Sequence, residues 1–159
     1  MSVKDFTVTY ATLADIPEIF AMSKSLIDSY EDVGSIDYDK VLAWVQRKIS
    51  ENIATYRCVF LKGVKAGYYR LAAESGETEL DDLYILPEFQ GQGLGTAVLQ
   101  RCIDSVETPM FLYVFKRNIG AIKLYARMGF SISKEVGNTR YIMRREVDRP
   151  GTQVYNNGI

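Results

Sequence analysis

The sequence predicts a single α+β domain in which a mixed, mostly antiparallel central sheet is flanked by four helices. Three observations support this prediction. Segments with strand character and segments with helix character alternate along 159 residues, with no internal repeat or linker. Three strand-like segments follow one another in the first half of the chain, which is typical of an antiparallel meander. A glycine-rich loop then joins a strand to a helix in mid-chain.

A first strand over residues 6–10, rich in β-branched and aromatic residues, is expected to precede two amphipathic helices. Thr12 can cap the first helix, and Pro17 lies in its first turn. Asp37 can cap the second helix, which ends at Asn52. Apolar residues recur at helical spacing in both segments, so each helix has one face suited to a core.

The predicted meander consists of strands over residues 55–61, 64–73 and 79–86. Turn signals separate them, at Lys62-Gly63 and at either Ser75-Gly76 or Gly76-Glu77. The remaining elements are a helix over about 94–106, a strand over 110–115, a helix over 118–128 closed by Gly129, and a hairpin of 131–135 with 139–147. The predicted order is therefore βααβββαβαββ within one domain, residues 1–147, followed by a polar C-terminal tail, residues 148–159.

Composition excludes several classes of protein. The chain contains no histidine, so any catalytic base must be another side chain or a water held by one, and no histidine metal site can form. The net charge of −1 gives no general electrostatic reason to bind nucleic acid or an anionic membrane. Cys58 and Cys102 fit no metal-ligand spacing. Met1 to Asp5 lack the apolar segment of a secretion signal, so we expect a reduced, cytoplasmic protein with no metal cofactor.

The segment Gln90-Gly91-Gln92-Gly93-Leu94-Gly95-Thr96 is the most informative part of the chain. Alternate glycines between a strand and a helix allow close approach of a bulky ligand, and the helix N-terminus favours phosphate. The segment is not a P-loop, because no Lys followed by Ser or Thr comes after the second glycine. It also lacks the G-x-G-x-x-G spacing of a dinucleotide site.

A different pattern does fit this loop. Gln90-x-x-Gly93-x-Gly95 resembles the acetyl-CoA pyrophosphate loop of the GNAT superfamily of N-acetyltransferases, and the preceding residues 83–89 resemble that family's lead-in. A second resemblance lies downstream, where residues 118–130 match the family's asparagine, alanine, leucine-tyrosine and glycine-phenylalanine signature. The specific part of the resemblance covers residues 80–130, and the βααβββαβαββ order is also that of a GNAT-like domain.

The resemblance implies a binding site for acetyl-CoA as cosubstrate. Backbone N–H groups from Gly91 to Thr96 would hold the pyrophosphate. Main-chain groups of Leu83, Tyr84 and Ile85 would pair with the pantetheine arm where their strand parts from its neighbour. Asn118 would cap the following helix and contact the pantetheine or the substrate. The implied cofactor-binding residues are Leu83, Tyr84, Ile85, Gln90, Gly91, Gln92, Gly93, Leu94, Gly95, Thr96 and Asn118.

The resemblance also implies roles in catalysis. Departure of the CoA thiolate requires a proton donor, and Tyr125 holds the position of the family's tyrosine. The attacking amine must lose a proton, and Glu79 or Asp81, directly or through water, is the candidate base. These two carboxylates share a strand face by the two-residue period, and Asp82 is expected in a β-bulge because the apolar alternation breaks there.

The acceptor is less well defined. The family's acceptor wall corresponds to residues 28–39, which are acidic and aromatic here, and this composition would suit a cationic amine, either a small molecule or a peptide or protein amine. Two functions remain open: an N-acetyltransferase acting by direct attack in a ternary complex, and a non-catalytic acyl-CoA sensor or scaffold of the same fold. A homodimer is also predicted, through an exposed edge of the strand over residues 139–147 or through the tail.

Overall fold

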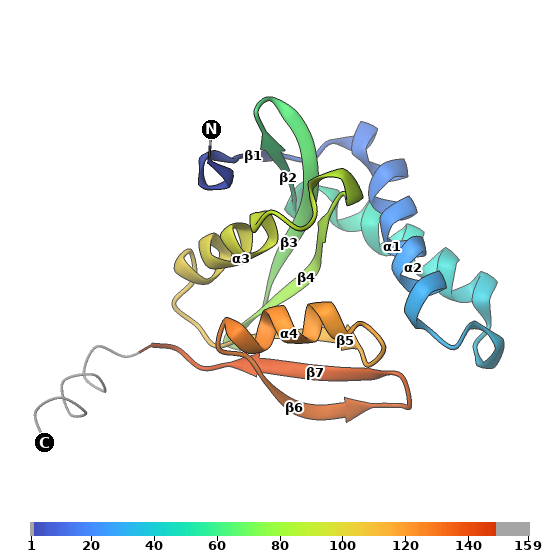
Figure 1. The fold of residues 1–159 in the computed structure, drawn as a ribbon. Coiled ribbons are helices and arrows are strands. Elements are labelled where there is room, and N and C mark those ends of the chain that lie inside the picture. Colours follow the sequence, from blue (N-terminus) through green and yellow to red (C-terminus); the bar gives the residue numbers. More distant parts are fainter. Residues whose placement is uncertain (1, 149–159) are drawn as a thin grey trace, which may run out of the picture.

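The computed structural model describes residues 2–148 as one sheet with helices on both faces (Figure 1). The sheet has seven strands in the order β1-β2-β3-β4-β5-β7-β6. All neighbours are antiparallel except β4 and β5, which are parallel. The strands are β1 (Thr7–Tyr10), β2 (Tyr56–Leu61), β3 (Val64–Glu74), β4 (Glu77–Ile85), β5 (Met110–Phe115), β6 (Ser131–Val136) and β7 (Arg140–Arg145).

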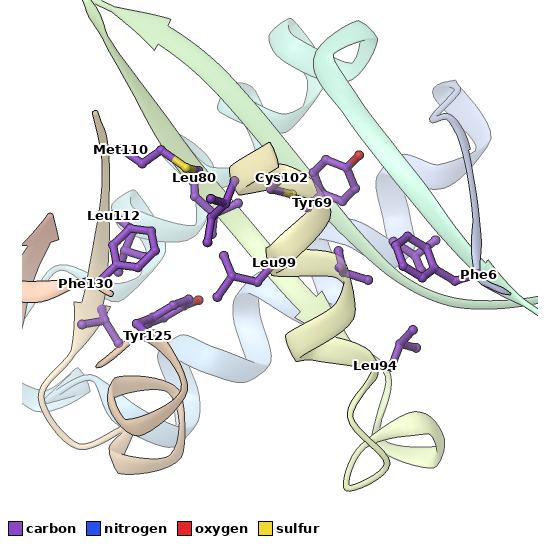
Figure 2. Packing of buried hydrophobic residues seen from close by; sticks show 14 of the residues in the cluster. Phe6, Tyr69, Leu80, Leu94, Leu99, Cys102, Met110, Leu112, Tyr125 and Phe130 are labelled. Carbon is purple, nitrogen blue, oxygen red and sulfur yellow. The ribbon is translucent and has the colours of Figure 1, made fainter. Parts of the chain in front are cut away.

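The helices form two layers on opposite faces of the sheet. They are α1 (Ile16–Tyr30), α2 (Tyr38–Asn52), α3 (Leu94–Asp104) and α4 (Ile119–Arg127). One core lies beneath α3 and α4 and contains alternate residues of the strands, such as Leu80 and Leu112 (Figure 2). A second core lies beneath α1 and α2 and contains Tyr56 and Tyr68. The predicted fold class and element order are confirmed.

Local capping explains where the helices begin. The Asp37 carboxylate accepts a hydrogen bond from the Lys40 backbone N–H at 3.2 Å, and α2 starts at the next residue, Tyr38. Thr12 instead begins a short 3-10 turn, Leu13–Asp15, so α1 starts later than a Thr12 cap alone would suggest. Inside that turn the Asp15 carboxylate accepts a hydrogen bond from the Thr12 N–H at 2.8 Å.

The turn between β3 and β4 consists of Ser75 and Gly76, the first of the two expected positions. Ser75 and Gly76 both have positive φ, 51° and 81°, which matches a two-residue hairpin turn. Pairing therefore runs up to the turn, with Glu74 opposite Glu77. As a result β4 starts two residues before the expected residue 79.

The predicted open edge is wrong. β7 pairs with β5 on one side and with β6 on the other, so it is an interior strand, and the outer position belongs to β6. The alternating sequence predicted the strand itself correctly. Its neighbours could not be predicted in the same way, because they depend on β7 inserting between β5 and β6 when the β6–β7 hairpin joins the sheet. The tail residues proposed for dimer contacts, Val154, Tyr155 and Ile159, lie outside the described residues.

Candidate active site

The two parallel strands at the centre of the sheet separate soon after they pair. β4 pairs with β5 only at Thr78 with Met110 and at Glu79 with Phe111. Both strands continue beyond this point, to Ile85 and to Phe115. In residues 2–148, the edge of β4 that faces β5 beyond Glu79 has no strand partner. A ligand with amide groups can therefore pair there as an added strand would.

A β-bulge in β4 accompanies this separation and confirms the expectation for Asp82. Its φ is +60°, and the register with β3 shifts between Tyr68 and Arg70. The extra residue turns Asp81 and Asp82 to the same side, where the Lys48 ammonium of α2 contacts both carboxylates, at 3.1 and 2.9 Å. The strand is thus pinned to α2 at the position where it leaves β5.

A glycine in β3 allows the same bend. Gly67 lies opposite Ile85, and a Cβ at this position would be 2.2 Å from the backbone oxygen of Tyr84. No side chain fits at that distance, so β3 and the end of β4 approach each other only because residue 67 is glycine. The contact holds the last residues of β4 in place before the glycine-rich loop.

The glycine-rich loop has the backbone geometry of an anion cradle. Gly91 and Gly93 have positive φ, 78° and 86°, a region that glycine adopts without strain. Gly93 is the N-cap of α3, and the N–H groups of Leu94, Gly95 and Thr96 make no hydrogen bond within residues 2–148. Free N–H groups at the positive end of a helix dipole suit a phosphate.

Two side chains fix this loop relative to the strand gap. The Gln90 amide donates a hydrogen bond to the Ile85 carbonyl at 2.8 Å, which ties the start of the loop to the end of β4. Leu94 is buried in the core beneath α3. The side chains of Gln92 and Thr96 are exposed, and a Cβ at Gly91 would meet no atom within 4 Å. The space above the loop is open to a ligand.

Tyr125 projects from α4 into the core beneath the gap (Figure 2). Its ring packs edge-on against Phe130, with centroids 5.8 Å apart. Its hydroxyl makes no hydrogen bond within residues 2–148. Every fully buried polar side-chain atom in these residues has a hydrogen-bond partner, so the Tyr125 hydroxyl oxygen is not fully buried and can be reached from outside. Burial, and then the charge of Asp82, raise the pKa of Tyr125. The phenol therefore keeps its proton at neutral pH and can donate it.

Asn118 has the predicted capping role. Its side-chain oxygen accepts a hydrogen bond from the Ala121 backbone N–H at 3.2 Å, and α4 begins at Ile119. The cap fixes the start of the helix that carries Tyr125, nearly two turns further on. Gly129, with φ +95°, follows the helix as expected of a C-terminal glycine.

The structure distinguishes the two candidate bases. Glu79 is partly buried and makes no ion pair or hydrogen bond within residues 2–148. Burial, and next the charge of Asp81, raise the pKa of Glu79 to about 7, although Lys48 and Arg70 act in the opposite direction. A carboxyl with a pKa near neutrality can accept a proton in one step and release it in another.

Asp81, by contrast, is held by two cations. Lys48 lies 3.1 Å from one carboxylate oxygen, and Arg70 lies 2.9 Å from the other. Burial and the charge of Asp82 raise the pKa of Asp81, whereas these two cations lower it. Both oxygens are occupied, so Asp81 fits a structural role better than that of a base.

Sequence reasoning did not identify the partners of the acidic pair. Three side chains from other elements contact this pair: Lys48 of α2, Arg70 of β3 and Tyr56 of β2. The Tyr56 hydroxyl donates a hydrogen bond to the Asp82 carboxylate at 2.8 Å. Lys48 is 33 residues from Asp81, so spacing could not connect them. One signal was present: Lys48 falls within the apolar stripe of α2, where a lysine stem can be buried only if its charge finds a partner.

The expected acidic wall is largely engaged within itself. Asp28 pairs with Lys24 at 2.8 Å and accepts a hydrogen bond from the Tyr38 hydroxyl at 2.5 Å. Asp37 is used as the cap of α2. Tyr30, at the end of α1, stacks on Phe115 of β5 with centroids 6.4 Å apart. The end of α1 thus lies beside the end of β5, and several carboxylates of residues 28–39 are already paired.

Comparison with known proteins agrees with this geometry. The model of the acetyltransferase (GNAT) family matches residues 19–130. The chain belongs to the GNAT acetyltransferase family. Its fold resembles that of an N-acetyltransferase of Thermoplasma acidophilum solved in complex with coenzyme A, with TM-score 0.70, 16% identity and coverage of 89% of this chain and 99% of that one. The ribosomal-protein-S18-alanine N-acetyltransferase of Escherichia coli gives TM-score 0.65 and 20% identity, covering 92% and 96%.

Sequence relatives of this GNAT chain match over shorter stretches. The spermine/spermidine N(1)-acetyltransferase of Bacillus subtilis is 32% identical over 80 residues, which cover 46% of this chain and 53% of that protein. A mycothiol acetyltransferase of Corynebacterium aurimucosum is 35% identical over 78 residues, covering 44% and 26%. The chain therefore spans about half the length, or less, of the curated relatives that it matches.

Two further features of residues 2–148 bear on the expected partners. No helix in this part of the chain is both long enough and apolar enough to cross a membrane. Within the same residues, no cluster of three or more histidine, cysteine, aspartate or glutamate side chains is arranged to hold a metal ion.

Replacing Glu79 with Gln should change how stability depends on pH. The pKa of Glu79 is about 7 in the folded protein, against an ordinary value of 4.5. Between these values the folded state holds a proton that the unfolded chain has lost, so the free energy of unfolding of the wild type falls as pH rises and levels off above about 7. The variant has no carboxyl at residue 79 and should not show this decrease. Urea unfolding at several pH values should therefore show the free energy of unfolding of the variant rising relative to that of the wild type between about pH 4.5 and 7.

The exposed Glu88→Gln provides a control for loss of a surface carboxylate. A difference between Glu79→Gln and wild type that stayed constant from pH 4.5 to 8 would contradict the assigned pKa.

Proposed function

We propose that the protein transfers an acetyl group from acetyl-CoA to a primary amine, by direct attack of the amine on the thioester while both are bound. The separation of β4 from β5, next to the free N-terminus of α3, is the observation that carries this proposal. It combines a strand edge that can pair with an extended amide-containing arm and a loop suited to its phosphates. Membership of the GNAT family supports the same assignment.

Acetyl-CoA would be held mainly by main-chain groups. The N–H groups of Leu94, Gly95 and Thr96 point from the start of α3 and would bind the pyrophosphate, and the left-handed Gly91 and Gly93 keep side chains away from it. The edge of β4 from Leu83 to Ile85 would pair with the pantetheine arm. The side chains of Leu83 and Ile85 pack on the core beneath α3 and α4, so their part in binding belongs to the backbone.

Two side chains on opposite faces of the sheet would carry out the proton transfers. Glu79 faces the α1 and α2 side and, with a pKa of about 7, takes a proton from the acceptor ammonium, directly or through water. Tyr125 rises from the α3 and α4 side and donates its phenolic hydrogen to the departing thiolate. The gap between β4 and β5 is where these faces meet.

Gly93→Val should abolish binding of acetyl-CoA. The branched side chain would lie where the diphosphate is expected, at a residue with φ +86°. Because backbone strain alone could unfold the protein, Gly137→Val provides a matched control: Gly137 also has positive φ, 57°, and lies in the turn between β6 and β7. Calorimetry should show lost binding for the first variant and wild-type affinity for the second. Wild-type affinity in a folded Gly93→Val protein would rule out this loop as the cradle.

Tyr125→Phe should lower kcat by on the order of 10²-fold while leaving the affinity for acetyl-CoA nearly unchanged, because only the proton donor is removed. The measurement is steady-state release of free thiol, with acetyl-CoA affinity determined separately by calorimetry. An unchanged kcat on an accepted amine would remove Tyr125 from the mechanism.

The pH profile of kcat/KM tests the base. In the wild type kcat/KM should rise through about pH 7, as Glu79 loses its proton, until the amine is also deprotonated. Glu79→Gln should lower kcat/KM and remove the inflection near pH 7, whereas Asp81→Asn should retain an inflection. A wild-type profile in Glu79→Gln would show that Glu79 is not the base.

The same assay separates an enzyme from a binding module. Release of thiol from acetyl-CoA in the presence of one amine of a broad panel supports the enzyme. Tight acetyl-CoA binding with no release on any amine would instead favour the non-catalytic acyl-CoA sensor or scaffold.

A further inference from the structure

One face of β5 lies beside the candidate base and is covered by α1 only at its Phe115 end. Met110, Leu112 and Val114 point into the core beneath α3 and α4, so the alternate residues of β5 point the other way. Those residues are all aromatic: Phe111, Tyr113 and Phe115. Phe115 packs under α1, where Tyr30 stacks on it, but Tyr113 is 43% exposed. The accessible aromatic surface of β5 is therefore made by the exposed Tyr113 and the half-buried Phe111.

This surface is continuous with the proposed reaction centre. Glu79 pairs in register with Phe111, so their side chains leave the sheet on the same face as neighbours. Phe111 in turn contacts Tyr113 edge-on, with ring centroids 6.3 Å apart. An acceptor whose amine is at Glu79 would rest its remaining atoms on these two rings.

The charges around this surface are arranged asymmetrically. The Arg140 guanidinium lies over the Tyr113 ring, 5.2 Å from its centroid, and makes no ion pair or hydrogen bond within residues 2–148. Several carboxylates on the neighbouring strands are engaged: Glu135 pairs with Lys116, Glu77 pairs with Arg144, and Asp81 and Asp82 share Lys48. Arg140 is thus an unpaired cation at the Tyr113 end of this surface, whereas Glu79, and Glu74 whose charge acts on it, are carboxylates without a partner within residues 2–148 at the other end.

We propose that the acceptor is a primary amine bearing an apolar or aromatic group and a carboxylate, with the apolar group on Phe111 and Tyr113 and the carboxylate on Arg140. A carboxylate can pair with a guanidinium through two hydrogen bonds, and an arginine already stacked on a ring loses little freedom in doing so. This inference rests on the proposed acetyl transfer and names its substrate class.

The spacing suits an acceptor the size of a dipeptide. Phe111 and Tyr113 are two residues apart along β5, roughly 7 Å, and Glu79 is one strand away, roughly 5 Å. The distance from Glu79 to Tyr113 is then roughly 8 Å, close to the length of two extended residues. A polyamine of the same length would instead bring a second ammonium next to Arg140, where the charges repel.

The test compares ligands that differ by one group, using calorimetry on protein saturated with coenzyme A. Glycylphenylalanine should bind about tenfold more tightly than glycylphenylalaninamide, which lacks only the carboxylate, and more tightly than spermidine. Glycylglycine, which lacks the ring, should also bind more weakly. Arg140→Gln should reduce the affinity for glycylphenylalanine to that for the amide and leave the amide unaffected.

Arg101→Gln is the matched control, because Arg101 also lies over an aromatic ring, Phe6, 5.4 Å from its centroid, but is near the end of α3. It should leave all four affinities unchanged. Tighter binding of spermidine, or equal binding of glycylphenylalanine by wild type and Arg140→Gln, would overturn the proposal.

Thiol release from acetyl-CoA, measured with the same ligands, keeps the two proposals apart. Release with spermidine but not with glycylphenylalanine leaves acetyl transfer intact and overturns the acceptor class. Arg140-dependent binding without release from any amine supports the carboxylate subsite and contradicts acetyl transfer.

Discussion

The bulge at Asp82 is the constraint on which the site depends. A regular strand would alternate Asp81 and Asp82 between the two faces and would continue to pair with β5. With Asp82 at φ +60°, both carboxylates turn toward Lys48, and the strand leaves β5 immediately after Glu79. A non-glycine residue in this conformation costs energy, and the ion pairs with α2 together with the Tyr56 hydroxyl offset it. Strain and ligand gap are therefore two results of one local distortion.

The same distortion explains why Asp81 and Asp82 have different chemistry from Glu79, which precedes them on the same strand. Lys48 and Arg70 are both engaged in holding the bulge, because removing either would leave the partly buried Asp81 with one cation instead of two. Glu79 lies outside this group and has no ion-pair partner within residues 2–148, so burial, and next the charge of Asp81, bring its pKa to about 7. What distinguishes the two structural carboxylates from the proposed base is therefore that they have ion-pair partners, not that they are aspartates.

Much of the fold and part of the site could be predicted from the sequence, because the relevant signals are local. Asp37 and Asn118 mark helix starts, Gly93 marks the entry to α3, and the broken alternation around Asp82 marked the bulge. Contacts between distant segments could not be predicted. Nothing local connects Lys48 to Asp81, or indicates that β7 lies between β5 and β6, since both depend on how separate elements pack.

This distinction matters most for the acceptor. Counting acidic residues before the fold is known suggests a site for cations, because Asp28, Asp37, Asp81 and Asp82 all lie in segments that flank the gap. Each of these carboxylates is already satisfied by a lysine, an arginine, a tyrosine hydroxyl or a backbone N–H. A paired carboxylate contributes little attraction to a ligand, so the field that an acceptor meets is set by groups left over after folding. Along β5 that group is Arg140, so the side of the gap that carries the base also presents a cation suited to an acceptor carboxylate.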